Sequence, residues 1–468
     1  MHEFQAAFTI AIFALAVLFL IRRPGGINES VPTSIGAALL IAAGIVSFAD
    51  LLQVAQTVSG AAVTILSTIV MSIILDNIGY FRWAANNLIA YSKGSGVRLY
   101  WLTVSLCFLM TLFFNNDGSI LITTPIIIQI CSILQLKMHQ KIPYLLSGAF
   151  VATASSAPIG VSNLANLIAL KIVGLDLNRY AELMFVPSMA GIAAIAVLLF
   201  LYFRKVIPRR IPVMNTANPR IPRAYYNSHM IRRWADRETR WSAPYHPLIE
   251  RPDEEEPVDW KLFRLSLAIV VLTRAGFFAA ERYGIPMEAV ALLGTVVLLL
   301  VRRWRTGVGA GDIIRKTPWH ILLFAFSIYV IVVALNHAGL TALIVQIFKP
   351  LMLLGDGYGI AASGLLLTVM SNAMNNLPSV MIGTLTLTEM GLPEFSLQVA
   401  YLAAIIGSDI GALLTPMGTL ASLIWIYMLR RNKIPITWGT YMKAAWRVIP
   451  VGLFVSLLSL YLWTQWIL

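Results

Sequence analysis

Residues 113–125 read FFNNDGSILITTP, and this stretch places two asparagines and an aspartate inside a long apolar run. An unpartnered polar group in hydrocarbon costs roughly 2–7 kcal/mol. An ionisable side chain in such a run therefore marks a candidate functional site. Gly118 gives the same stretch the freedom to turn. We expect a polar turn inside a membrane here, rather than one continuous helix.

The composition sets the class of protein. The chain has 468 residues, of which 58% are hydrophobic and 12% charged, whereas soluble domains carry about 25% charged residues. Apolar runs of about 17–25 residues, the length of a bilayer-crossing helix, recur along the chain. The alternation of about ten residues that marks a membrane β-barrel strand is not seen. The sequence predicts an all-α polytopic membrane protein.

The net charge of +13 has a membrane explanation. The basic residues stand in short loops between apolar runs, as the positive-inside rule requires, so nucleic acid is not an expected partner. The chain has no phosphate-binding loop, no HExxH motif and no nucleophile paired with a base. Its two cysteines, Cys107 and Cys131, both lie in apolar runs. We therefore expect no enzyme activity, no cofactor and no metal site.

The apolar runs divide into two groups around a polar stretch. We predict a first transmembrane repeat over 1–203, a cytoplasmic linker over 204–261, and a second, inverted repeat over 262–468. The helices are expected near 4–21, 34–53, 58–79, 98–114, 118–136, 144–173, 183–203, 262–281, 286–302, 319–339, 357–373, 377–388, 398–414, 418–429 and 442–466.

Placing the basic loops in the cytoplasm fixes the topology. It requires 98–136 and 357–388 to enter and leave the membrane on one side. The prediction is about ten transmembrane helices, two re-entrant hairpins and two broken helices, in the inner (plasma) membrane with both termini outside. The alternative is twelve complete crossings with no re-entrant segment.

Three pairs of segments support an internal repeat. LDNIGYF (75–81) precedes LNHAGLT (335–341) by 260 positions, and NNDGSIL (115–121) precedes NNLPSVM (375–381) by the same distance. PIGVSNLANLI (158–168) resembles PMGTLASLI (416–424). Inverted repeats with Gly- or Pro-interrupted segments at matching positions are typical of secondary transporters, whose substrate site lies at the midplane. The sequence predicts a transporter.

The interrupted segments supply candidate substrate-binding residues. Amides can donate and accept hydrogen bonds, so converging asparagines suit a neutral hydroxylated solute or a partly dehydrated cation. Alternatively, these groups only satisfy interrupted backbone. The candidates are Asn115, Asn116 and Ser119 in the first hairpin, Asn372, Asn375 and Asn376 in the second, Ser155, Asn163 and Asn166 in the first broken helix, and Thr415, Thr419 and Ser422 in the second.

Two carboxyl groups are candidates for proton coupling. Asp117 follows the asparagines of the first hairpin, and Asp409 precedes the second helix break. A carboxyl whose environment alternates between dry and hydrated can change its protonation state, which is what a proton carrier needs. The alternative is a structural hydrogen bond to freed backbone.

These motifs resemble those of a known family. FFNNDGSILITTPIII, SNAMNNLPSVMIGTL and GSDIGALLTPMGTLASLIWIYMLRR are similar to segments of the arsenical pump membrane protein (ArsB) family, within the wider ion transporter superfamily. The resemblance runs from about residue 35 to the C-terminus, without the linker. It departs at Thr153 and Lys171, where relatives carry acids.

The resemblance implies export of arsenite and antimonite driven by proton entry. Its midplane asparagines map to Asn115, Asn116, Asn375 and Asn376, and its buried acids to Asp117 and Asp409. The expected partners are the inorganic solute, protons and membrane lipid, and some relatives also use a cytosolic ATPase subunit. Two alternatives stay open: Na⁺/H⁺ exchange and a passive subunit of an ATP-driven pump. Na⁺-coupled dicarboxylate transport would favour Ser-Asn-Thr tips with few acids, so the NND segment and Asp409 argue against it.

Overall fold

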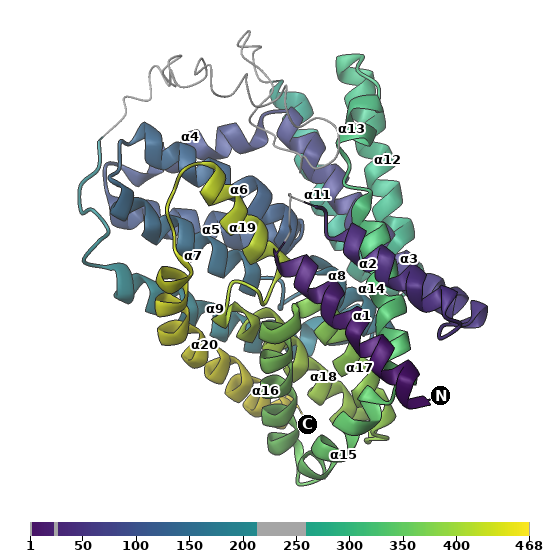
Figure 1. The fold of residues 1–468 in the computed structure, drawn as a ribbon. Helices are drawn as coiled ribbons and strands as arrows, with labels where there is room; N and C mark the ends of the chain where they lie inside the picture. The colour runs from purple at the N-terminus through teal and green to yellow at the C-terminus, as the bar shows by residue number, and fades with distance from the viewer. Residues whose placement is uncertain (1, 23–26, 213–258, 468) are drawn as a thin grey trace.

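The computed structural model describes residues 2–22, 27–212 and 259–467, and each regular element in these ranges is a helix (Figure 1). The helices before the central segment are α1 (His2–Arg22), α2 (Ser30–Ala42), α3 (Phe48–Asn77), α4 (Tyr80–Ser92), α5 (Gly96–Phe113), α6 (Asn116–Ile133), α7 (Met138–Ala154), the 3-10 helix η2 (Gly160–Ser162), α8 (Leu164–Val173) and α9 (Leu177–Phe203).

The helices after the central segment have a similar order. They are α11 (Trp260–Glu281), α12 (Met287–Thr306), α13 (Gly311–Lys316), α14 (His320–His337), α15 (Leu340–Met352), α16 (Asp356–Met374), α17 (Asn376–Glu389), α18 (Glu394–Asp409), the 3-10 helix η4 (Gly411–Leu414), α19 (Leu420–Arg431) and α20 (Trp438–Ile467).

The helices have the length and surface of a membrane protein. Nine helices among the described residues are long and apolar enough to cross a bilayer. Large apolar side chains on their outer faces are exposed, such as Leu272 at 69% and Phe454 at 63% exposure. A water-soluble monomer would not present many such faces together. The prediction of an all-α polytopic membrane protein is confirmed.

The predicted boundary between the second and third helices was wrong. The polar residues near Gln53–Thr57 predict a break, whereas α3 runs without one from Phe48 to Asn77. The helix begins at a capping box between Ser47 and Asp50, and Val54 and Val58 on its inner face are buried. Burial of this apolar stripe outweighs the polar residues on the other side.

Two short helices, α4 and α15, were not predicted. Each has 13 residues, too few to span hydrocarbon of about 30 Å at 1.5 Å per residue. Both begin after a glycine with a positive φ, 90° at Gly79 and 83° at Gly339. The left-handed turn suits glycine, which has no Cβ. Each turn ends a long helix and begins the short helix that precedes a hairpin.

The element order from the end of α3 to α9 matches that from α14 to α20. The division into repeats over 1–203 and 262–468, with inverted orientation, stays a prediction. Most of the predicted linker, residues 213–258, lies outside the described residues. Both chain ends lie on the lower side of the view in Figure 1, at α1 and α20.

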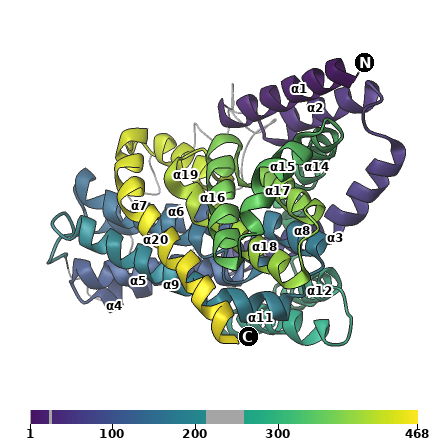
Figure 2. The same ribbon diagram turned by 90° about the horizontal axis from the view of Figure 1, so that it is seen from below.

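The interrupted elements appear where the sequence predicts them. The chain forms a helical hairpin of α5 and α6 and another of α16 and α17. The segment from α7 to α8 is broken at 155–163, and that from α18 to α19 at 410–419. The last helix before the central segment, α9, packs along the last helix of the chain, α20. In Figure 2, α20 crosses the front of the view. This frame holds the hairpin tips and helix breaks inside the protein.

Candidate functional site

A small cavity lies between the tips of the two hairpins. Its volume, measured as the space open to the centres of water molecules, is about 30 Å³, which is enough for a water or two. Its polar lining comes from both tips and from the first helix break: Asn116, Asp117, Asn163, Asn375 and Asn376. Three segments that are far apart in the sequence therefore bring five residues, all predicted to be functional, to one place.

The first tip is built by an asparagine cap. α5 ends at Phe113, and Asn115 caps α6 by accepting a 2.6 Å hydrogen bond from the Gly118 amide on its side-chain oxygen. A Cβ at position 118 would lie only 2.8 Å from that oxygen, so the cap needs the glycine. The Asn116 side-chain oxygen accepts from the Asp117 amide at 2.8 Å. The first turn of α6, the positive end of a helix dipole, is thereby directed at the cavity.

The second tip is built the same way but with a strained residue. Asn375 has φ of 79° and ψ of 153°, a conformation that costs a non-glycine residue about 1–3 kcal/mol. Its side chain accepts from the Leu377 amide at 3.4 Å and donates to the Met417 carbonyl at 3.3 Å. No described residue hydrogen-bonds the side chain of Asn376, which is 5% exposed and lines the cavity. That amide is available to a solute.

Asp409 is held by the first helix break. It is the last residue of α18 and is 1% exposed. One carboxyl oxygen accepts from the Asn163 amide at 2.8 Å, and the other accepts from the Asn166 amide at 2.7 Å. Asp409 does not itself line the cavity, but Asn163 does. Asn163 therefore connects the cavity to a buried acid on the other half of the chain.

Other predicted residues satisfy backbone at the breaks and do not line the cavity. Asn372 donates to the Thr368 and Gly411 carbonyls at 2.8 and 2.9 Å and accepts from the Thr415 amide at 2.8 Å. Thr419 caps α19 by accepting from the Ser422 amide at 3.0 Å. Ser119 and Ser155 donate to carbonyls of their own or adjacent helices. These contacts agree with the alternative in which the polar side chains only satisfy interrupted backbone.

Several buried polar atoms near the site have no hydrogen-bond partner among the described residues. Leaving such an atom unpartnered costs about 1–3 kcal/mol, so each one marks a place for water, a solute or a conformational change. The atoms are Asn115 Nδ2, Ser162 Oγ, Asn166 Oδ1, Ser371 Oγ and Thr415 Oγ1. They come from both hairpins and both breaks.

Sequence reasoning missed Arg274, in the middle of α11. Its Nε donates to the Phe113 carbonyl at 2.6 Å, and its Nη2 donates to the Phe114 carbonyl. The side chain is 9% exposed. The sequence does contain a signal that could have identified Arg274 as a candidate, because it is a basic residue within the apolar run 262–281. Sequence reasoning also missed the apolar wall of the cavity, which consists of Leu164, Ile321, Phe324, Leu377 and Leu420.

Lys171, where the family resemblance led us to expect an acid, donates to the Gln56 carbonyl at 2.6 Å. Its ammonium group is exposed and stabilises a carbonyl of α3 at the far end of α8. Lys171 does not line the cavity.

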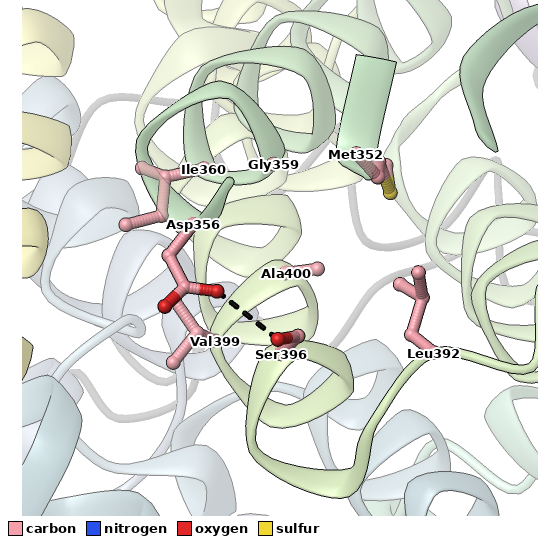
Figure 3. A pocket seen from close by; sticks show the side chains of 8 residues that line it. All are labelled: Met352, Asp356, Gly359, Ile360, Leu392, Ser396, Val399 and Ala400. Atoms are coloured by element: carbon pink, nitrogen blue, oxygen red, sulfur yellow. Dashed lines mark hydrogen bonds between the residues drawn. The ribbon is translucent and has the colours of Figure 1, made fainter. Parts of the chain in front are cut away.

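A second cavity lies between α16 and α18 (Figure 3). Its volume by the same measure is about 10 Å³, which is at the limit for a single water. The Ser396 hydroxyl donates to the Asp356 carboxyl at 3.0 Å across it (Figure 3). None of the predicted site residues lines this cavity, so the cavity between the tips is the candidate site.

Comparison with known proteins agrees with this architecture. The citrate transporter family model matches residues 16–407. A Bacillus subtilis protein named as an arsenical pump membrane protein is 45% identical over 97% of this chain and 99% of its own length. An Escherichia coli arsenical pump membrane protein is 30% identical over 96% of this chain and 97% of its own. An uncharacterised transporter of Mycobacterium tuberculosis is 22% identical over 98% of both.

Proposed function

The chain belongs to the citrate transporter family and to the arsenical pump membrane proteins, and from this premise we propose that it exports arsenite and antimonite from the cytoplasm in exchange for protons. That it is a membrane transporter follows from its family and from the nine long apolar helices among its described residues. The substrate, the coupling ion and the direction of transport are the proposal. We place it in the plasma membrane with both termini outside.

The observation that carries the proposal is the chemistry of the cavity lining. Four asparagines and one aspartate surround about 30 Å³, and among its ten described lining residues none is basic. Arsenous acid near neutral pH is a small uncharged trihydroxy solute, which amides can bind by donating and accepting hydrogen bonds. A tricarboxylate would need cationic partners and a larger space. The lining residues therefore favour an inorganic hydroxide over citrate as the substrate.

The cysteines support binding of the hydroxide form rather than a thiolate complex. The chain has two cysteines. Cys107 and Cys131 are free and buried, and neither lines the cavity. A thiophilic metalloid that was held by sulfur would need a reachable thiolate. We propose that the side chains of Asn116, Asn375 and Asn376 bind the hydroxyl groups instead.

Proton coupling is assigned to the two acids. Asp117 lines the cavity, and Asp409 is joined to it through Asn163. A proton on Asp117 would neutralise its charge when the neutral solute has left, which allows the empty site to return across the membrane. Asp409 would provide a second position whose charge is stabilised by two amide donors.

The test uses everted membrane vesicles with an acidified interior and no ATP, where export appears as accumulation of radiolabelled arsenite. We expect uptake that a protonophore abolishes and that Asp117→Asn reduces at least about tenfold, since one charge state is lost. Asp356→Asn is the matched control, because Asp356 lies in α16 away from the site.

Each failure has a different meaning. No uptake until ATP and a soluble ATPase are added would favour the pump-subunit alternative. Sodium-dependent changes in vesicle pH without arsenite movement would favour Na⁺/H⁺ exchange. Normal uptake by Asp117→Asn would remove Asp117 from the coupling mechanism.

A further inference from the structure

The C-terminal end of helix α5 is hydrogen-bonded by Arg274, a basic residue from the second half of the chain. Arg274 on α11 donates to the carbonyls of Phe113 and Phe114, the last residue of α5 and its C-cap. The guanidinium lies 5.5 Å from the ring centre of Phe277. Its Nη1 is buried and has no partner among the described residues. The positive charge of Arg274 therefore lies beside the first two residues of the FFNNDG turn.

Among the described residues, carbonyl groups compensate this charge and carboxylates do not. Among the described residues, no acid lies within ion-pair distance of Arg274, although ion pairs do form elsewhere, as between Arg302 and Asp312 at 2.6 Å. The last carbonyls of a helix have no partner within the helix and carry about half a negative charge together. Arg274 satisfies two carbonyls there and balances that partial charge.

The carbonyl ends of interrupted helices have a known use in membrane transporters. Together with unwound backbone they coordinate Na⁺, and the site stays stable because the ion replaces the missing hydrogen bonds. In this chain a guanidinium already occupies the two carbonyls beside the first tip. A second cation in the same place would face repulsion at short range in surroundings that screen it poorly.

We propose that Arg274 is a tethered cation that takes the place of a coupling Na⁺ at the first hairpin tip, and so makes this transporter independent of Na⁺. In this role Arg274 is a positioning residue for the tip and a selectivity-determining residue against alkali cations. The proposal refines the proton coupling proposed above, but its main test does not depend on arsenite.

The test measures thermal unfolding of the purified full-length protein in NaCl, KCl and choline chloride at equal ionic strength. We expect no Na⁺-specific shift in the wild type, in Arg274→Lys, which keeps a cation, or in Arg264→Ala. Arg264 is an exposed arginine on the same helix and serves as the matched control. Arg274→Ala frees the two carbonyls and should gain a saturable Na⁺-specific rise of about 3 °C or more.

Each outcome bears on the proposal. A Na⁺-specific shift in the wild type would overturn it, and so would a folded Arg274→Ala protein that ignores Na⁺. If Arg274→Ala aggregates in choline, Na⁺ in the medium should rescue it, and Arg274→Gln should behave in the same way. Aggregation of both variants in every salt would show a purely structural role and contradict the proposal.

A second measurement separates this inference from the proposed function. In everted vesicles, arsenite uptake by the wild type should be equal in Na⁺ and choline, whereas uptake by Arg274→Ala should require Na⁺. If the wild type moves no arsenite, the proposed substrate is wrong, and the thermal unfolding data still decide the role of Arg274.

Discussion

At the residue scale, the contact between Asp409 and two asparagines is the most informative one in the site. Its two carboxyl oxygens accept from Asn163 and Asn166 at 2.8 and 2.7 Å. A carboxylate has two acceptor oxygens, whereas an asparagine has one acceptor and one donor group. The pair of amide donors is therefore matched to an ionised carboxyl at position 409.

We predict that Asp409→Asn destabilises the protein and stops proton-driven transport. One amide donor would then face another, which costs about 1–3 kcal/mol. The double variant Asp409→Asn with Asn166→Asp restores a donor opposite an acceptor, so it should recover most of the lost thermal stability. Transport should not recover, because the acid has moved. Thermal unfolding and vesicle uptake, measured on the same preparations, test both parts.

The double variant also tests the alternative reading of Asp409 as a structural group. If it regains transport together with stability, the hydrogen bonds matter and the position of the acid does not. Wild-type uptake by Asp409→Asn alone would exclude Asp409 from proton coupling.

The residues of the site were predictable to the extent that the repeat exposed them. Asn116 and Asn376 occupy matching positions 260 apart, and both line the cavity. The direction of a side chain was not predictable. Asn372 looks equivalent in the sequence, yet it is used by the backbone of the second break, because η4 passes within reach of it. The hydrogen-bond partners of Arg274 are the carbonyls of Phe113 and Phe114, which are distant in the sequence, so only the fold shows these contacts.

At the element scale, hairpins and breaks could be predicted, whereas the short helices could not. Asn, Gly and Pro within apolar runs point to interruptions, as at 115–118 and 416–418. α4 and α15 have 13 residues each, too few to give a membrane-spanning signal. Their starts at Gly79 and Gly339 depend on backbone angles that the sequence permits but does not require.

The packing of α16 against α18 gives an element-scale prediction. A Cβ at Gly407 would lie 2.1 Å from the Gly364 carbonyl oxygen, which is backbone and cannot rotate away. Gly407→Ala should therefore force the helices apart, lower the free energy of unfolding by about 1–3 kcal/mol or more, and abolish transport. Gly359→Ala in the same α16 meets nothing within 4 Å and should be neutral or stabilising by up to about 1 kcal/mol.

Thermal unfolding in detergent compares the two variants directly. The contrast between them carries the prediction, since both add one methyl group to a helix of the same pair. Equal unfolding temperatures for Gly407→Ala and the wild type would mean that α16 and α18 can separate without cost.

At the scale of the whole molecule, buried and partly buried polar contacts join the two halves. Glu281 at the end of α11 accepts from the Leu177 and Asn178 amides at 2.6 and 2.9 Å and so caps α9. Ser456 of α20 donates to the Pro187 carbonyl of α9 at 3.0 Å. With the contacts of Arg274 and Asp409, each half completes the hydrogen bonds of the other.

This interlocking predicts how the halves behave when the chain is divided. Each separated half would leave several buried polar groups unpartnered, at about 1–3 kcal/mol apiece, and would expose the faces of α9 and α20 that cover each other. We expect neither half, divided between residues 213 and 258, to yield a monodisperse protein alone. Co-expressed halves should co-purify through a tag on one of them and regain arsenite uptake.

Division at Gly191, inside α9, should not support assembly, because it interrupts a helix at its contact with Ser456. Separate halves that purify as stable, folded proteins would contradict the interlocked fold and would require each half to satisfy its own buried groups.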